Sequence, residues 1–377
     1  MTVEEQACGV MQLVKGGAML RQAKSSFAAR PNDVFVPDVL IRKFHLSSGA
    51  TVAGPTTRGR DHRLTLSDVT SVCGLDPADF AERKPFDELT SVDPTERFAL
   101  ARCGLMTMRV MDLVAPVGKG TRGLIVSPPK AGKTTFLRDF VRGVREENPD
   151  LRVVAVLIDE RPEEVTEFRR QTQAEVLASS MDQMASEHTA LASLVYDHVR
   201  CELECGRDVV IVLDSLTRMA RAFNVHTPRN RDGGRGGGGG ILSGGLSPTA
   251  MEIPRRIFGM ARKIEGGGSV TVIASILVDT GSRMDQVIFE EFKGTGNSEL
   301  VLDRKLAELR VYPAVDIARS GTRREEKLLT EAEMKVSHAL RRALANASTI
   351  EATKILVSRL AKFPTNAEFI RNATVET

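Results

Sequence analysis

One short run of residues carries the clearest chemistry of this sequence. It reads Ser127-Pro128-Pro129-Lys130-Ala131-Gly132-Lys133-Thr134, after the apolar segment RGLIVS and before a helical pattern that begins TFLRDFV. A Gly-x-x-x-x-Gly-Lys-Ser/Thr run between a strand and a helix cradles phosphates on converging backbone N–H groups, although Ser127 stands where that pattern has its first glycine. The alternative is a plain strand–turn–helix with a capping threonine and solvated lysines, which the matching flanks disfavour. We therefore predict an ATP site made by Lys130, Ala131, Gly132, Lys133, Thr134 and Phe136.

Acidic residues close two other apolar segments. DVVIVLD ends in Asp214, followed by Arg218 and Arg221 at helical spacing, and LRVVAVLID is followed by Glu160 and Arg161. A carboxylate beside the phosphates can orient and deprotonate the attacking water, and another can hold the metal. We predict that Glu160 is the base, that Thr134 and Asp214 hold Mg²⁺, and that Arg218 contributes to the ATP site. Solvated strand ends remain the alternative for the acids, but together with the phosphate loop they make NTP hydrolysis the leading chemistry.

Apolar segments at 122–127, 151–159, 208–214 and 269–279 must position these residues. Near-continuous Val/Ile/Leu runs are typical of parallel strands that are covered on both faces, and 133–147 and 184–205 have helical spacing. The fold class is therefore α/β, with a βαβ-type nucleotide-binding architecture. Residues 6–75 read as short strands separated by turns, which suggests a small β-barrel. We expect a barrel at 6–75, a linker at 76–115 and an ATPase domain at 116–377 that contains a Gly-rich insert at 232–245 and ends in helices.

Composition excludes several classes of protein. The chain has 377 residues, 42% of them hydrophobic and 27% charged, so ordinary cores are possible and general disorder is excluded. No apolar run reaches the roughly 20 residues of a membrane span, and the start lacks a secretory pattern, so we expect a cytoplasmic protein with no membrane partner. The net charge of +3 and the 5% of aromatic residues do not by themselves indicate nucleic acid. Five cysteines without a signal argue against a disulfide framework, and Cys201 and Cys205 form the only metal-like spacing, which is insufficient for zinc.

Longer stretches are recognisable as they stand. VLIDERPEEVTE (156–167), DVVIVLDSLTRMARAFN (208–224), DTGSRMDQVIFEEFKGTGN (279–297) and RVYPAVDIARSGTRREE (310–326) closely resemble the bacterial Rho transcription termination factor family. The likeness covers residues 9–377. It implies a RecA-like ATPase domain preceded by a cold-shock/OB-type barrel. It also implies a cytoplasmic homohexameric RNA-dependent ATPase and helicase that translocates on single-stranded RNA and acts on the RNA polymerase elongation complex.

The resemblance also assigns roles to single residues. Arg323 falls where the family has an arginine finger that acts in trans on the neighbouring subunit, and Arg310 is a second basic candidate. Arg161 would couple the phosphate end to the neighbour. Such a trans arginine would make hydrolysis conditional on assembly. Without the surrounding motif, Arg323 would read as an ordinary exposed basic residue.

RNA contacts follow from the same likeness. Arg283 in DTGSRMD and nearby Lys293 would hold RNA inside the ring. The second ring loop has Gly240 at its usual basic position, and we expect Arg229, Arg231 and Arg235 of the preceding stretch to replace that charge; a low-complexity insert without contacts is the alternative.

The barrel departs from its family. Its first strand reads Gly16-Gly17-Ala18-Met19-Leu20-Arg21 and lacks the usual stacking aromatics, whereas Phe35 keeps the aromatic of the next strand. Two missing rings would cost about 2–6 kcal/mol in RNA binding. Basic residues could keep a sequence-tolerant grip on phosphates: Arg21, Arg42, Lys43, Arg58, Arg60 and Arg63.

Other functions remain open from the sequence. One is a Rho-like ring ATPase with an altered RNA-loading preference or another client. A rotary ATP synthase-like subunit shares the phosphate loop and trans arginine, but lacks the barrel. A non-catalytic RNA-binding assembly protein is disfavoured because Lys133, Thr134, Glu160, Asp214 and Arg323 are all present. The RNA preference, the openness of the ring, the loading factors and the target transcripts are not set by the sequence.

Overall fold

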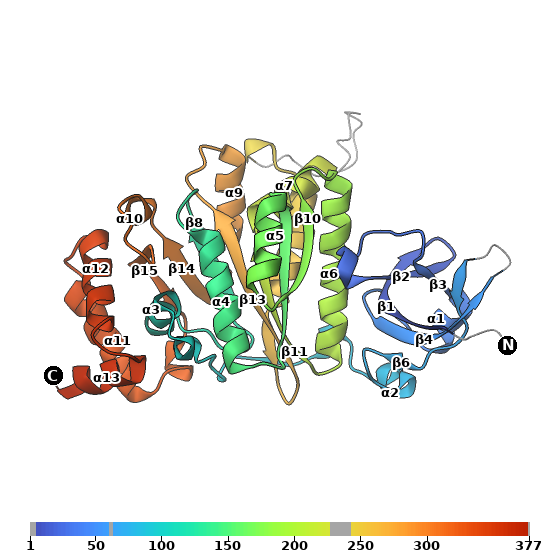
Figure 1. Ribbon diagram of the computed structural model, residues 1–377, viewed down its shortest axis with the longest axis horizontal. Coiled ribbons are helices and arrows are strands. Elements are labelled where there is room, and N and C mark those ends of the chain that lie inside the picture. The colour runs from blue at the N-terminus through green and yellow to red at the C-terminus, as the bar shows by residue number, and fades with distance from the viewer. Residues whose placement is uncertain (1–4, 60–62, 227–242, 376–377) are drawn as a thin grey trace.

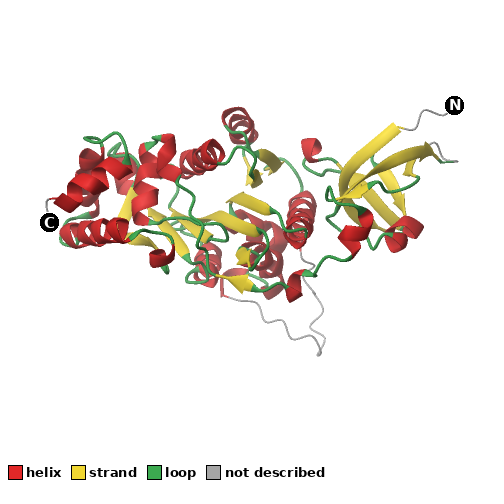
Figure 2. Ribbon diagram, turned by 90° about the horizontal axis from the view of Figure 1, so that it is seen from below, coloured by secondary structure: helices red, strands yellow, loops and turns green. Residues whose placement is uncertain are grey.

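The chain folds into a small barrel and a larger α/β part that lie side by side (Figure 1). A computed structural model describes residues 5–59, 63–226 and 243–375. The two ends of the chain lie at opposite ends of the molecule, and Figure 2 shows the barrel set apart from the helices and strands of the larger part.

The barrel is closed by one long-range strand pairing. Its strands are β1 (Glu5–Val14), β2 (Gly17–Arg21), β3 (Val34–Pro37), β4 (Thr51–Arg58) and β5 (Leu64–Leu66). They are ordered β1-β2-β3-β5-β4, and β1 also pairs with β4, so the sheet closes on itself; β6 (Ser71–Val72) pairs antiparallel with β4. Alternate residues such as Leu20, Val36 and Val52 fill the interior, and α1 (Asp38–Lys43) follows β3. This is an oligonucleotide-binding-type barrel, as predicted.

The connection is more ordered than the word linker implies. It contains α2 (Pro77–Ala81), β7 (Ser91–Val92) and α3 (Met106–Val114). Residues Met108, Val110 and Met111 of α3 belong to the core of the α/β part. Phe98 and Leu100 belong to the same core, so the packing of this part begins within the connection, before the expected boundary at 116.

The α/β part is built on a sheet ordered β10-β9-β11-β13-β8-β14-β15. Its strands are β8 (Arg122–Ser127), β9 (Arg152–Glu160), β10 (Glu175–Ser180), β11 (Asp208–Asp214), β13 (Ser269–Leu277), β14 (Ser298–Leu302) and β15 (Val315–Thr322); the short β12 (Arg262–Ile264) pairs with β13 and β7. In this order the six strands from β10 to β14 run parallel, and β15 runs antiparallel to β14.

Successive residues of a strand enter different cores. In β9, Val154 and Val156 belong to one apolar cluster, and Val153 and Ala155 belong to the other. Both faces of the sheet are therefore covered, which explains the uninterrupted apolar runs and confirms the predicted fold class.

Helices cover the two faces (Figure 1): α4 (Lys133–Glu147), α5 (Pro162–Gln171), α6 (Ala185–Glu204), α7 (Leu216–His226), α8 (Glu252–Gly259), α9 (Arg283–Phe292) and α10 (Arg304–Glu308). The chain ends in α11 (Glu331–Leu344), α12 (Thr349–Leu360) and α13 (Asn366–Val375), as expected. Helices α11 and α12 begin with reciprocal caps, Thr330 with Glu333 and Ser348 with Glu351. Among the described residues, no helix is both long and apolar enough to cross a membrane.

Candidate functional site

The phosphate loop lies between the end of β8 and the start of α4. Helix α4 begins at Lys133, and Gly132 before it has a φ of 90°, a left-handed conformation that glycine adopts without strain. Lys130 is exposed and also left-handed, and Ala131 is buried. The start of this 15-residue helix presents backbone N–H groups, and its dipole favours an anion there.

Lys133 joins two acids that come from separate strands. Its Nζ lies 3.2 Å from Oε1 of Glu160, at the end of β9, and it pairs with Asp214, at the end of β11. Asp214 also accepts a 2.8 Å hydrogen bond from the Ser275 hydroxyl of β13. All three charged side chains are at most 13% exposed. The carboxyl ends of parallel strands thus meet beside the phosphate loop.

Charge and burial set the protonation of this cluster. Burial, and then the Asp214 carboxylate, raise the pKa of Glu160 above its ordinary value. Burial alone would lower the pKa of Lys133, but the Asp214 and Glu160 carboxylates raise it above its ordinary value. Lys133 is therefore a firm cation, and Glu160 is a more basic carboxylate than a solvated one.

A second cation touches the same acid. Nε of Arg218 lies 3.2 Å from Oε1 of Glu160, and its NH1 donates a 2.7 Å hydrogen bond to the carbonyl of Asp159. Arg161 is exposed directly after Glu160 and precedes α5. The structure thus brings Arg218 into the cluster, whereas Arg161 lies exposed at the start of α5.

The oxygen donors around the loop suit Mg²⁺ bound together with phosphates. The hydroxyl of Thr134 donates a 3.3 Å hydrogen bond to Glu164, close to the phosphate loop, and Asp214 supplies a carboxylate. No group of three or more potential His, Cys, Asp or Glu ligands occurs among the described residues. Mg²⁺ usually takes one or two protein oxygens and completes its shell with phosphates and water, and the Thr134 hydroxyl and the Asp214 carboxylate are donors of the kind it uses.

The prediction that Phe136 contacts ATP is wrong. Its side chain is only 3% exposed and packs with Leu137 and Phe140 in the core beneath α4. The apolar stripe of α4 turns this ring toward the sheet, away from the loop.

An aromatic residue that sequence reasoning missed lies beside the loop instead. Tyr312 is 49% exposed, and a Cβ placed on Gly132 would lie 3.9 Å from its ring. Its hydroxyl donates a 3.3 Å hydrogen bond to the carbonyl of Ala307, which fixes the ring. The signal in the sequence was that Tyr312 is one of only two tyrosines in a chain without tryptophan.

Arg323 and the phosphate loop of its own chain lie at opposite ends of the strands of the sheet. It follows β15, and its N–H donates a 2.7 Å hydrogen bond to the carbonyl of Asn297, whose side chain accepts from the N–H of Arg122 at the start of β8. The phosphate loop follows the other end of β8. Because this strand is six residues long, the loop lies about 20 Å from Arg323. Arg310, in contrast, is exposed in the same segment as Tyr312, on the loop side.

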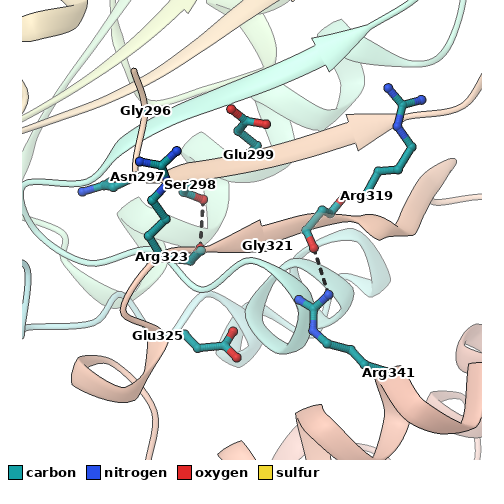
Figure 3. A pocket seen from close by; sticks show the side chains of 11 residues that line it. Gly296, Asn297, Ser298, Glu299, Arg319, Gly321, Arg323, Glu325 and Arg341 are labelled. Carbon is teal, nitrogen blue, oxygen red and sulfur yellow. Dashed lines mark hydrogen bonds between the residues drawn. The ribbon is translucent and has the colours of Figure 1, made fainter. Parts of the chain in front are cut away.

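Arg323 borders a cavity of about 470 Å³ (Figure 3). Glu299 lies between Arg323 and Arg319 on the same side of the strands, and Arg341 donates a 3.0 Å hydrogen bond to the carbonyl of Ser320 below them. Arg319 and Arg323 are both exposed. This edge therefore presents arginines outward, toward whatever packs against it.

The structure describes some of the residues that are predicted to contact RNA inside the hexameric ring. Arg283 is exposed at the start of α9, after the capping residue Ser282. Lys293 lies 3.6 Å from Glu290 at the end of that helix. Arg235, like Arg229 and Arg231, lies outside the described residues.

On the barrel, Phe35 faces outward opposite Met19 of the next strand. A Cβ on Gly17 would lie 2.6 Å from the Phe35 ring, so the ring packs over the glycine backbone. The Arg63 guanidinium lies 5.7 Å from the ring centroid, within cation–π range. One aromatic ring is thus presented on this face.

The prediction that Arg21 holds RNA phosphates needs correction. Arg21 is 9% exposed, pairs with the buried Asp33 and donates a 2.7 Å hydrogen bond to Gln12. Its charge is already neutralised by Asp33, so it joins strands within the barrel. Arg42 and Lys43 are exposed but pair with Asp38 and Asp68, and Arg58 is exposed; Arg60 lies outside the described residues.

Comparisons with known proteins agree with the division of the chain into a barrel and an α/β part. Residues 7–78 match the family described as "Rho termination factor, RNA-binding domain", and residues 107–322 match "ATP synthase alpha/beta family, nucleotide-binding domain". Two solved structures share the fold of the larger part. One, an ATPase from the type III secretion system of pathogenic bacteria, has a TM-score of 0.57 and 25% identity over 69% of this chain and 72% of that one. An ATP synthase subunit from Nanoarcheaum equitans has a TM-score of 0.53 and 18% identity over 69% of this chain and 63% of that one, and supports the fold alone.

Curated relatives extend the likeness to nearly the whole chain. The transcription termination factor Rho of Cereibacter sphaeroides is 42% identical, covering 96% of this chain and 85% of that protein. That of Pseudomonas aeruginosa is 44% identical, covering 96% and 86%. Against the longer Rho of Micrococcus luteus, at 42% identity, this chain spans 54% of the relative's length. The chain therefore belongs to the transcription termination factor Rho family.

Proposed function

We propose that this chain is an ATP-hydrolysing, RNA-binding motor of the Rho type. It would load single-stranded RNA on the barrel, hydrolyse ATP with Mg²⁺ between subunits of a homohexamer, and release transcripts from the RNA polymerase elongation complex in the cytoplasm. The observation that carries the proposal is the meeting of Lys133, Glu160 and Asp214 beside the phosphate loop, in a chain whose first part matches an RNA-binding domain. We assign the barrel to residues 6–75, the connection to 76–115 and the ATPase part to 116–377, with the second half of the connection packed into the core of the ATPase part.

The proposed hydrolysis uses the charges already paired in the cluster. Lys133 would exchange part of its contact with Glu160 and Asp214 for contact with phosphate oxygens, because the two carboxylates and the phosphate compete for the same ammonium group. Glu160, which Arg218 keeps oriented, would then accept a proton from the attacking water. Thr134 and Asp214 would hold Mg²⁺, which supplies charge neutralisation on the phosphates.

A divided site accounts for the place of Arg323. About 20 Å separates it from its own phosphate loop, so it would act on ATP held by a neighbour, with Arg161 exposed on the receiving side. Tyr312, beside Gly132, would offer a ring to the adenine base. Arg283 would contact RNA in the ring, and Arg235 is proposed for the same task from its sequence position alone.

A second candidate keeps the motor and changes what it loads. Phe35 is the one aromatic ring on the presented face of β2 and β3, and its ring covers Gly17. A stacked base is worth about 1–3 kcal/mol, so a single ring gives weak, sequence-tolerant loading.

One assay tests both candidates: ATP hydrolysis with poly(C), poly(U), single-stranded DNA and no polymer. The motor predicts stimulation by RNA, and the altered platform predicts similar stimulation by poly(C) and poly(U). Stimulation by no RNA would remove the Rho-type proposal, while a strong poly(C) preference would remove only the second candidate. Phe35→Ala should weaken RNA binding by about 5- to 150-fold, with Val39→Ala as an exposed, uncharged control on the same barrel.

A further inference from the structure

The end of β9 contains a bulge. The register between β9 and β10 shifts at Asp159, which has no partner on β10. Its φ of 56° is left-handed, a conformation that residues with a side chain seldom adopt. The pairing resumes at once, because the N–H of Met181 donates a 2.9 Å hydrogen bond to the carbonyl of Glu160. Bulges of this kind re-aim side chains beside active sites, and here the residue directly after the bulge is Glu160.

Arg218 holds the bulge from one side. Its NH1 donates hydrogen bonds of 2.7 Å to the carbonyl and 3.2 Å to Oδ2 of Asp159, while its Nε lies 3.2 Å from Oε1 of Glu160. One guanidinium thus serves two successive carboxylates, which compete for it. Arginine and a carboxylate favour a bidentate pair. If Asp159 offered both of its oxygens to Arg218, the contact between Arg218 and Glu160 would be lost.

His188 approaches Asp159 with its other nitrogen held in place. This histidine lies in the first turn of α6 and is 5% exposed. Its Nε2 lies 4.0 Å from Oδ1 of Asp159, whereas the hydrogen bond from Arg218 goes to Oδ2. Its Nδ1 lies 2.8 Å from the hydroxyl of Ser179, a buried residue near the end of β10. Because a carboxylate only accepts, the ring proton belongs on Nε2, and Nδ1 accepts from the Ser179 hydroxyl.

The ring of His188 is neutral. Burial lowers the pKa of His188 below its ordinary value, although the carboxylates of Asp159, Glu187 and Asp182 act in the opposite direction. A neutral N–H attracts a carboxylate without forming an ion pair, so Asp159 keeps its charge for Arg218. At 4.0 Å this attraction is between a dipole and a charge, and contacts of this kind commonly shorten when substrate binds.

We infer that His188 is a positioning residue for ATP hydrolysis, which holds Oδ1 of Asp159 and thereby keeps Arg218 in contact with Glu160. The inference rests on the proposed function, in which Glu160 is the base. His188 acts through two other side chains and is therefore not itself a catalytic residue. A core histidine that only packed beside Ser179 would need no carboxylate at its second nitrogen.

Two substitutions separate the two nitrogens of His188. His188→Gln places an amide near Nε2 and keeps a donor for Asp159, whereas His188→Asn places an amide near Nδ1 and keeps a partner for Ser179 alone. His188→Asn should lower kcat about 10- to 100-fold, because small displacements of a catalytic group are costly in rate. His188→Gln should retain most of the parent kcat. Binding of a non-hydrolysable ATP analogue should be unchanged in both variants.

The other results contradict the inference. Equal kcat values for the two variants, or a larger loss in His188→Gln than in His188→Asn, would show that the contact with Asp159 does not matter. A parent chain that hydrolyses no ATP would overturn the proposed function, and the inference with it. An active parent with equal variants would overturn the inference alone.

A double variant tests whether His188 acts through Asp159, and it remains decisive if His188→Gln does not fold. Asp159→Asn suits the left-handed backbone, but its amide has a single acceptor oxygen that cannot serve both His188 and Arg218. In that background, His188→Asn should lower kcat no further. If the loss in the double variant equals the product of the two separate losses, His188 does not act through Asp159.

Mixed rings test which half of the shared site is damaged. His188→Asn subunits keep Arg323, and Arg323→Ala subunits keep the phosphate-loop half, so mixing them should recover activity. Mixing His188→Asn with Lys133→Ala subunits should not, because both lack an intact phosphate-loop half. The Lys133→Ala and Arg323→Ala pair is the reference for recovery. If that pair recovers and the His188→Asn and Arg323→Ala pair does not, the substitution has damaged the whole fold and the inference is wrong.

Discussion

Replacing Arg323 by alanine tests whether the ATP site is shared between two chains. An arginine about 4 Å from a transferring phosphoryl group interacts with it by about 4 kcal/mol at an effective dielectric of 20. At the roughly 20 Å that separate Arg323 from its own phosphate loop, the same interaction falls to about 0.8 kcal/mol, and salt screening reduces it to about 0.1. The residue can therefore act on ATP only in a neighbouring chain.

The expected loss is large because a trans arginine is worth about 10³–10⁵ in rate, or about 4–7 kcal/mol. Arg323→Ala should therefore lower kcat by at least about 10³-fold, with little change in nucleotide binding. Arg319→Ala is the matched control, since this arginine is exposed on the same strand and borders the same cavity. It should leave most of the activity.

Mixing two inactive proteins gives the decisive assay. Arg323→Ala subunits keep their phosphate loop, and Lys133→Ala subunits keep their arginine. In randomly mixed rings with head-to-tail interfaces, roughly one interface in four combines both intact halves and should recover activity in that proportion. No recovery, when mass spectrometry of the intact rings shows that subunits have exchanged, would refute the shared site. So would an Arg323→Ala protein that retains more than about a tenth of its activity.

Three further predictions follow from buried residues. Glu160→Gln should lower kcat about 10²–10⁴-fold while nucleotide binding survives, and the parent rate should fall with acid as the raised pKa of Glu160 is crossed; a pH–rate profile of both proteins checks this. Phe136→Ala should lower the free energy of unfolding in urea by about 3–5 kcal/mol without weakening nucleotide binding. Tyr312→Ala should weaken nucleotide binding and leave the free energy of unfolding nearly unchanged. Weaker nucleotide binding by a folded Phe136→Leu protein would restore the assignment of Phe136 to the ATP site. Burial, followed by the Arg152 charge, lowers the pKa of His198 to about 3, so the unfolded chain binds the extra proton below pH 6.5 and the folded chain does not. Stability should therefore fall by about 2 kcal/mol between pH 7 and 5 and keep falling toward pH 3, and His198→Asn, which keeps a donor for Gly49, should lose this slope in urea titrations.

The sequence was most informative where local pattern and chemistry coincide. Strands β8 and β11 and helix α4 have the predicted ends, because an apolar run stops at a polar residue that the phosphate site needs. The sequence could predict that Glu160 and Asp214 lie close together, because the carboxyl ends of parallel strands lie side by side. The burial of Phe136 was also within reach, because it lies on the apolar stripe of α4 with Leu137 and Phe140.

Other features depend on contacts between distant segments. The Arg21–Asp33 pair forms between neighbouring strand ends, beside the Leu20–Val34 pair of β2 and β3, and a lone arginine on a strand gives no sign of such a partner. Tyr312 reaches Gly132 only because β15 turns back beside β14, which no local pattern indicates. The same reversal places Arg323 at the far edge of the sheet.

Tyr312 gives this chain an internal optical probe. The protein has no tryptophan and only two tyrosines, and the other, Tyr196, packs against the core from α6. When the light is chosen to excite tyrosine and not phenylalanine, the ultraviolet emission of the native chain comes from these two rings, and the half-exposed one lies beside the phosphate loop. A nucleotide that covers Tyr312 should quench this emission, so binding can be titrated without a label and separately from turnover. The scarcity of aromatic residues, a weakness for gripping RNA, becomes an advantage for spectroscopy.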